Sequence, residues 1–403
     1  AIYMAVGSVG DTSLGSMVMP GFNADTYTLP VLEGIPQAKF ADPYPASNPL
    51  IMPIGKGWGR YTGIGGNLQW AFQNVKPYAN ERFNVSIQRE LVHHIVVDAT
   101  YFLNFGVNGT YNKQLNMSDP SLSYTYKAEL SRSIRNPFYQ YLTPAKFPGQ
   151  LRNQANVSKG SLLVPYPHYG TLTQQITPGP RNRYASLQFR AQRPFTKGFN
   201  LVGSYTYNRE RNETFFNSDE EYANRFFWMP STSPRHRVGF GTVAELPFGK
   251  GRSFLTGLHP VAEALIGGWQ LSSLVSWQNG DLLTFGQMEW NGQDPKVEDP
   301  NPQRWFKTEV FARAIAYTPR LNPRFYEGLR GPGIFGWDGT ISKFFPVKER
   351  FRLELRSEIY NVVNNVTLAN PSTSVTDFLF AKTLKPREYF YGRQLQYSLK
   401  LHF

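Results

Sequence analysis

The last thirteen residues of the chain, YGRQLQYSLKLHF, alternate between two kinds of side chain. One row is apolar or aromatic at Tyr397, Leu399, Leu401 and Phe403. The other row is polar at Gln394, Gln396, Ser398, Lys400 and His402. A period of two residues is that of a β-strand with one apolar face and one wet face. The segment is therefore predicted to be a strand, and it ends the chain on an aromatic residue.

The same alternation recurs in FNVSIQRE from Phe83, YASLQFRAQ from Tyr184, FNLVGSYTYN from Phe199 and FRLELRSE from Phe351. In the last segment the polar row consists of Arg352, Glu354, Arg356 and Glu358. Placing such a row against lipid would cost about 2–4 kcal/mol for each Arg near the bilayer midplane. A register slip of one residue would turn every side chain of the charged row toward lipid. We therefore predict a charge ladder that faces a lumen or solvent.

The composition limits the kinds of function. Aromatic residues make up 15% of the chain, which suits aromatic belts at two membrane interfaces. The absence of cysteine excludes disulfides, zinc-thiolate sites and thiol nucleophiles. The formal net charge of +13 would suggest nucleic acid as a partner of a soluble protein, but the basic residues are scattered and no RNA-binding signature is present. No nucleic-acid partner is predicted.

The connections between the predicted strands differ in length in a regular way. Short turns occur at LVHH, RPFTKG and PVKER, whereas long polar connections cover 107–181, 209–235, 287–334 and 364–390. If Phe403 is periplasmic, counting back places every short turn on the periplasmic side and nearly every long loop outside. Outer-membrane barrels have this asymmetry, and a soluble sandwich has no reason for it.

The predicted fold class is thus an all-β, antiparallel transmembrane β-barrel in the bacterial outer membrane, with membrane lipid as a partner. No stretch reaches the roughly 18 apolar residues of a spanning helix, so a membrane crossing would require a closed barrel. About a dozen strands are expected. They are clear over 81–403, whereas 1–80 is harder to assign, with MAVGSVG and GWGRYTGIGGNLQWAF as strand candidates and 20–57 as a Pro-rich loop.

Four segments resemble the barrel of large TonB-dependent receptors with an amino-terminal carboxypeptidase-regulatory-like domain, the Oar-like outer-membrane proteins. Residues 183–209 carry the repeated F–G–SYT pattern, and 234–252 open on HR and turn at ELPFGKG. Residues 264–285 contain IGGWQL, and 331–373 contain GPGIFGWDGTISKFFPVKERF. Together they span most of 183–403, and SIQREL near 90 extends the similarity. The motifs are specific in combination.

The resemblance implies a receptor for ligand uptake, and a barrel of 22 strands in the complete receptor. A plug, a regulatory-like domain and a TonB box are not recognisable here, and the chain starts without an initiator Met or a signal peptide. We therefore expect a carboxy-terminal barrel portion that TonB would reach through a missing amino-terminal region. The charge ladder would face the plug. Outer-membrane barrels present a terminal aromatic strand to their assembly machinery, so Tyr397, Leu399, Leu401 and Phe403 are the expected assembly signal.

Two sets of loop residues are candidates for binding. The carboxylates of Asp219, Glu220 and Glu221 could bind calcium, with a solvated loop as the alternative. Aromatic side chains could stack on sugars or contact peptides, with loop packing as the alternative. These are Tyr222, Phe226, Phe227, Trp228 and Trp290.

No cofactor and no catalytic activity are predicted. The glycine motifs GIGG and GPG lack a strand-to-helix setting, and no nucleophile or carboxylate pair is placed for catalysis. The leading hypothesis is an uptake receptor whose ligand is an oligosaccharide, a peptide or a metal chelate. The alternatives are an adhesive or structural surface protein that binds other proteins, or a passive porin. A membrane-embedded hydrolase ranks last.

Overall fold

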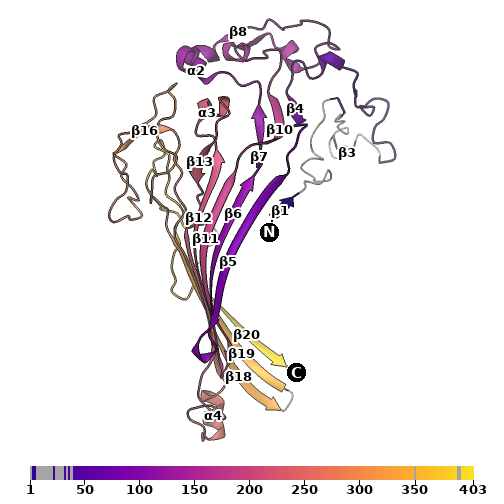
Figure 1. Cartoon of the computed structure of the whole chain (residues 1–403). Coiled ribbons are helices and arrows are strands. Elements are labelled where there is room, and N and C mark those ends of the chain that lie inside the picture. The colour runs from indigo at the N-terminus through magenta and orange to yellow at the C-terminus, as the bar shows by residue number, and fades with distance from the viewer. Residues whose placement is uncertain are drawn as a thin grey trace.

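The computed structural model describes residues 2–5, 21–22, 31–32, 35–36, 40–348, 351–387 and 392–403. Long strands form one curved antiparallel sheet, and a thick layer of loops lies at one end of it (Figure 1). Within these residues no helix is long and apolar enough to span a membrane.

The sheet contains eleven strands of the described chain, in the order β1-β5-β6-β11-β12-β14-β15-β18-β19-β20, with β13 paired to β12. Every pairing in it is antiparallel. The strands are β1 (Ile2–Ala5), β5 (Tyr78–Glu90), β6 (Val96–Val107), β11 (Asn182–Thr196), β12 (Phe199–Thr214), β13 (Phe227–Pro230), β14 (His236–Glu245), β15 (Trp269–Gln278), β18 (Ile334–Lys348), β19 (Phe351–Tyr360) and β20 (Gln394–His402). The predicted all-β antiparallel architecture is confirmed.

Smaller elements occupy the connections. Short sheets pair β4 (Leu68–Ala71) and β7 (Thr110–Gln114) with β10 (Leu172–Pro178), β16 (Met288–Trp290) with β17 (Phe311–Arg313), β2 (Val31–Leu32) with β3 (Ile35–Pro36), and β8 (Ser133–Arg135) with β9 (Asn156–Ser158). The α-helices are α2 (Pro120–Tyr126), α3 (Ser218–Tyr222) and α4 (Pro260–Ile266). The 3₁₀ helices are η1 (Gly59–Tyr61), η2 (Val92–His94), η3 (Lys127–Ser131), η4 (Gln150–Asn153) and η5 (Lys159–Leu162).

Short connections and long loops lie at opposite ends of the sheet, as predicted. The β5–β6 turn is η2, and Lys197 and Gly198 join β11 to β12 with positive φ angles of 52° and 79°. The carboxy terminus lies at this same end (Figure 1). The β14–β15 connection differs from the expected turn because it contains α4, whose first turn is capped by the His259 side chain and starts on Pro260. The β18–β19 turn includes 349–350, which lie outside the described residues.

The register separates two faces of the sheet. One row aligns Val85, Tyr101, Leu187 and Tyr207 across four neighbouring strands. These apolar side chains are exposed, between 37% for Leu187 and 67% for Val85. The opposite face is polar and internally hydrogen-bonded: the Ser86 and Thr100 hydroxyls lie 2.6 Å apart, and Thr100 donates to Asp98. We call these the outward face and the polar face.

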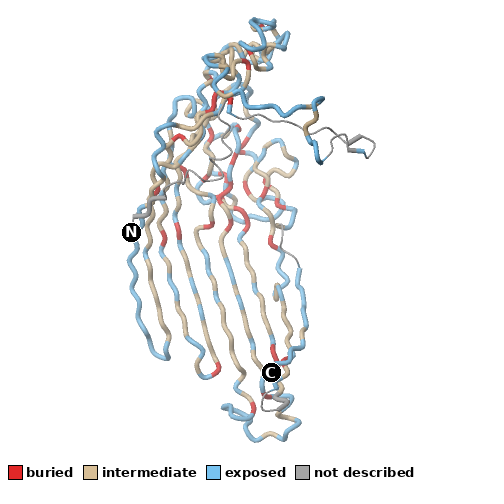
Figure 2. Tube along the Cα trace, turned by 90° about the vertical axis from the view of Figure 1, so that its right-hand side faces the viewer, coloured by how far each residue is buried: buried red, intermediate tan, exposed pale blue. Residues whose placement is uncertain are grey.

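The buried apolar core lies in the loops and not in the sheet. Most buried residues gather near the loop end, whereas the strands are mostly exposed or half-buried (Figure 2). We call this cluster the loop core; its members are Leu283, Phe285, Met288, Phe306, Val310, Phe311, Tyr326, Leu329 and Ala381. Phe285 is 1% exposed and packs edge-on against the rings of Phe306 and Tyr326. The long loops are therefore a packed layer with their own interior.

The first eighty residues follow the prediction only in part. Of the candidate strand MAVGSVG, Met4 and Ala5 belong to β1, and 6–10 lie outside the described residues. The segment GWGRYTGIGGNLQWAF contains η1 and β4. However, β4 pairs in parallel with β10 in a small loop sheet and does not join the large sheet, which corrects its assignment as a barrel strand.

Candidate functional site at the loop end of the sheet

Two long loops that are distant in sequence are tied together above the sheet. The Tyr124 hydroxyl of α2 donates to Asp219 of α3 over 2.7 Å, and the Tyr111 hydroxyl of β7 donates to Asn224 over 2.6 Å. The Tyr111 ring also packs edge-on against Phe226, with centroids 5.2 Å apart. These contacts fix the 108–181 loop against the 215–235 loop.

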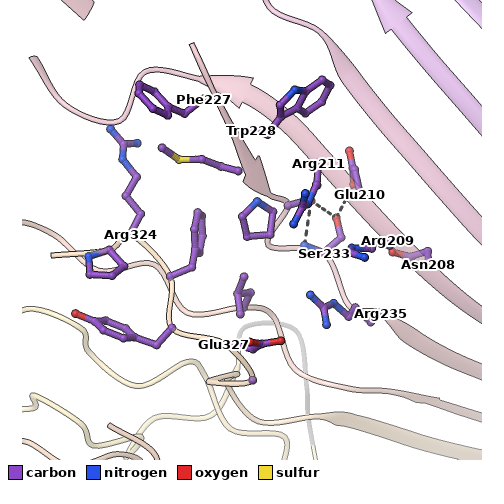
Figure 3. A pocket seen from close by; sticks show the side chains of 18 of the residues that line it. Asn208, Arg209, Glu210, Arg211, Phe227, Trp228, Ser233, Arg235, Arg324 and Glu327 are labelled. Carbon is purple, nitrogen blue, oxygen red and sulfur yellow. Dashed lines mark hydrogen bonds between the residues drawn. The ribbon is translucent and has the colours of Figure 1, made fainter. Parts of the chain in front are cut away.

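A cavity of about 420 Å³ opens beside this junction, between β12, β13 and residues 323–328 (Figure 3). We call it the mouth cavity. Its apolar lining includes Phe227, Trp228 and Met229 of β13, together with Tyr326 of the loop core. Sheet and loops thus both contribute to its wall.

Charged groups from separate segments reach the mouth cavity. Arg235 precedes β14, and Arg324 lies on the 323–328 segment, where its Nε donates to the Phe216 carbonyl. Glu210 of β12 accepts a hydrogen bond from the Ser233 hydroxyl, and Glu327 lies at another edge (Figure 3). The cavity therefore combines aromatic surface with groups of both signs.

Positive charge is concentrated just behind the cavity. Arg320 donates to the Phe285 and Asn322 carbonyls, and Arg330 donates to the Gly280 carbonyl. Burial lowers the pKa of both guanidinium groups below the usual value, and the nearby charge of Arg324 or Arg235 lowers it further. Both guanidinium groups are held by backbone carbonyls and so belong to the packing of the loop layer.

The aromatic candidates from the sequence lie in different surroundings. Phe227 and Trp228 line the mouth cavity and are 39% and 41% exposed. Tyr222 ends α3 on the surface. Phe226 stacks on Phe215, and Trp290 packs against Tyr326 beside the loop core. Sequence reasoning missed Arg235 and Arg324, because no local motif marks residues that are brought together from distant loops.

The three calcium candidates lie together on α3. The Glu220 carboxylate is paired with Arg225, and Asp219 accepts from Tyr124, so both carboxylates have protein partners. Asp219, Glu220 and Glu221 all lie in the first turn of α3, which Asn217 caps. Among the described residues no group of three or more His, Asp or Glu side chains is placed to hold a metal ion. The acidic residues begin a short helix.

The charge ladder lies on the polar face of the sheet. Glu354 is buried, accepts from the Ser342 hydroxyl and lies 2.8 Å from His402 Nε2, while Arg356 pairs with Glu358. The Arg352 guanidinium lies over the Phe344 ring. On the other face of β20, Tyr397, Leu399 and Leu401 are 54–70% exposed, and Phe403 follows the strand. The role of these four residues in assembly stays a prediction.

Several solved structures are similar to this chain. They include the Pseudomonas aeruginosa ferripyoverdine receptor bound to ferripyoverdine (11% identity, TM-score 0.37, 81% of this chain and 27% of that one). The outer membrane transporter YddB of Escherichia coli has 8% identity and a TM-score of 0.38, with 84% and 34% covered. A mutant ferric enterobactin receptor, PfeA of P. aeruginosa, has 10% identity and a TM-score of 0.39, with 81% and 31% covered. The chain thus spans about a third or less of the length of these structures.

No curated protein matches the sequence. The family model described as "Outer membrane beta barrel domain" matches residues 5–396, which is nearly the whole chain. This match confirms the location predicted from the sequence, the bacterial outer membrane. The exposed apolar face is therefore the lipid-facing face, and the loop end is extracellular by the usual asymmetry of such barrels. The chain belongs to the outer-membrane β-barrel domain family.

Proposed function

We propose that the chain forms part of the wall of an outer-membrane uptake receptor of the TonB-dependent class, and that the mouth cavity binds its ligand. The supporting observation is the position of the cavity: loops and β-strands meet there, at the extracellular end of a hydrogen-bonded polar wall. In this proposal the receptor is Oar-like, as the sequence resemblance implies, and TonB supplies the energy through an amino-terminal region not recognisable in these residues.

The chemistry of the cavity favours a ligand with a ring or apolar part and an acidic group. Phe227 and Trp228 offer aromatic faces for stacking. Arg235 and Arg324 supply guanidinium groups, which pair well with carboxylates and phosphates. Acidic oligosaccharides, acidic peptides and anionic metal chelates meet this description. The basic groups at the extracellular end would also raise the association rate of an anionic ligand with the receptor at low salt.

The wall below the cavity suits passage of a polar solute. Ser86, Thr100 and Gln188 line the polar face at mid-height, and the charge ladder lies on the same face of β19. In the proposed receptor this ladder would contact the plug. The buried Glu354 has Ser342 and His402 as partners, so this part of the wall is held in one arrangement.

The test is uptake by cells that carry the whole gene. Labelled acidic ligands of the three classes are supplied with and without an energised inner membrane. Phe227→Ala combined with Trp228→Ala should weaken ligand binding by about 5- to 150-fold, because each of the two stacking interactions removed is worth about 0.5–1.5 kcal/mol. Tyr222→Ala is the matched control, because Tyr222 is an exposed loop aromatic on α3.

Two results would contradict the proposal. Equal uptake with and without an energised inner membrane would indicate a porin and not a TonB-dependent receptor. If the double variant still binds the ligand with unchanged affinity, the mouth cavity is not the binding site, even if energised uptake is observed.

A further inference from the structure

Three arginines gather at the extracellular end of the outward face. Arg183 lies on β11, and Arg209 and Arg211 lie on β12. The register pairs Arg183 directly with Arg211 and pairs Ala185 with Arg209, so all three belong to the rows that continue the lipid-facing side chains. All three residues are exposed. We call them the outward arginine cluster.

The cluster lies at the boundary of the apolar band. Between Arg183 and Arg193 of β11, the outward residues are Ala185, Leu187, Phe189 and Ala191. Ten residues of strand cover about 34 Å. At a tilt of about 40–45° this corresponds to about 24–26 Å along the membrane normal, close to the apolar band of about 25 Å in such barrels. Arg183 and Arg193 therefore mark the two edges of the hydrocarbon layer.

The surface beneath the cluster is hollowed and amphipathic. A groove of about 480 Å³ is lined by the three arginines and by Tyr101, Leu187 and Tyr207. The side chains of Tyr101 and Tyr207 are exposed, and they continue the row of Leu187 on the two neighbouring strands. The groove thus has a cationic upper edge and an apolar floor that leads down to Phe189 on the same strand.

The positive charges of the cluster are not neutralised by carboxylates. One row higher, Arg181 and Glu213 pair with each other, so the Glu213 carboxylate already has a partner. Within the described part of the chain, Arg183, Arg209 and Arg211 form no ion pair. Arg183 stacks on the Phe105 ring, 5.2 Å from its centroid. Like charges directly opposite each other destabilise a sheet, so an anion from outside the chain would stabilise this arrangement.

We propose that the outward arginine cluster binds the phosphate-bearing headgroup of an anionic lipid in the outer leaflet, with an acyl chain lying over Leu187 and Phe189. Guanidinium groups bind phosphate in a bidentate manner. Arg183 and Arg211 lie at the edge of the apolar band, and Arg209 lies one row inside it, level with Ala185. The apolar floor favours a lipid over free phosphate, because a lipid also buries its acyl chain against apolar side chains. This site is on the opposite face from the polar wall. Arg209 and Arg211 are also among the residues that line the mouth cavity, so the experiment measures lipid binding and not uptake.

The experiment measures lipid binding to the protein purified from outer membranes in mild detergent. Native mass spectrometry follows titrations with a glycolipid carrying two phosphates, with its dephosphorylated form, and with inorganic phosphate alone. In the triple variant Arg183→Gln, Arg209→Gln, Arg211→Gln, affinity for the phosphorylated lipid should fall about a hundredfold, at about fivefold per basic residue near the membrane surface. The control is Arg135→Gln, Arg313→Gln, Lys385→Gln, which removes the same charge from exposed loop positions and should not change the affinity.

A second variant separates binding from folding. Arg183→Lys, Arg209→Lys, Arg211→Lys keeps the charge and should lose only a few-fold in affinity, while heat-modifiable gel mobility reports the folded barrel for each variant. Equal binding of the dephosphorylated lipid, or unchanged affinity in the folded glutamine variant, would overturn the proposal. Competition by inorganic phosphate at the same concentration as the lipid would show an anion site with no lipid specificity, and would also overturn it.

Discussion

Substituting Leu187 by arginine tests the assignment of the lipid-facing row most directly. Leu187 lies four residues from Arg183 and six from Arg193 on β11, so it is about 3 Å along the strand from the centre of the apolar band. An outward arginine near the midplane of a barrel costs about 2–4 kcal/mol. The ratio of folded to unfolded protein should therefore fall about 30- to 700-fold.

The assay is equilibrium unfolding by denaturant in lipid vesicles, followed by heat-modifiable gel mobility and tryptophan fluorescence. Gln188→Arg is the first control, because the adjacent Gln188 lies on the polar face; removing its hydrogen bond to Ser186 should cost only about 0.5–1.5 kcal/mol. Ala191→Arg is the depth control. It lies two residues from Arg193 near the interface, where the cost falls to about 0–1 kcal/mol.

The order of the three free-energy costs tests both the assignment of the two faces and the position of the membrane boundary. Leu187→Arg should be the most destabilising, and the other two should be mild. If Gln188→Arg were as costly as Leu187→Arg, the two faces of the sheet would have been assigned wrongly. If Ala191→Arg matched Leu187→Arg, the position of the membrane boundary at Arg193 would be wrong.

Three further predictions concern the loops and the terminal strand. Phe285→Ala empties the centre of the loop core, so the extracellular loops should lose about 3–5 kcal/mol and become protease-sensitive while the strands stay folded. Arg225 holds the pKa of Glu220 below its usual value, so the ion pair stabilises α3 at pH values above the ordinary carboxyl pKa. This stabilisation is lost as the pH falls through the lowered pKa of Glu220. Amide hydrogen exchange of residues 218–225, compared between pH 7 and pH 3, should show the loss. Deleting Phe403 should lower the yield of assembled barrel in cells, measured as the heat-modifiable fraction, with Tyr222→Ala as the control.

Strand faces could be predicted from sequence because lipid and water impose opposite demands on alternate residues. Leu187 and Gln188 are neighbours in the chain, yet only one of them is compatible with hydrocarbon, so the pattern itself fixes the register. The charged row at Arg352 and Glu354 carried the same information for β19. Strand ends were less certain, because polar side chains near the membrane boundary suit both a strand and a loop.

The loop layer could not be predicted in the same way. Phe285 and Phe306 carry no periodic signal, and their packing depends on bringing residues 283–329 together with residue 381. The helix α4 was missed because its residues continue the apolar pattern toward Trp269, although His259 and Pro260 form a recognisable helix start. The acidic cluster at Asp219 suggested a metal, but its partners, Tyr124 and Arg225, are chosen by tertiary contacts and a helical turn.

The loop core has a consequence for affinity. Phe285, Phe311 and Tyr326 already hold the extracellular segments in place, so a ligand of the proposed receptor would not have to order them on binding. For each side chain that is already ordered, the entropic cost of binding is lower by about 0.5–1.5 kcal/mol. In the proposed receptor, differences in affinity between ligands would then lie mainly in their dissociation rates. Long connections, usually regarded as the mobile part of a barrel, are here packed around an apolar interior, and in the proposed receptor this interior would preorganise the extracellular surface.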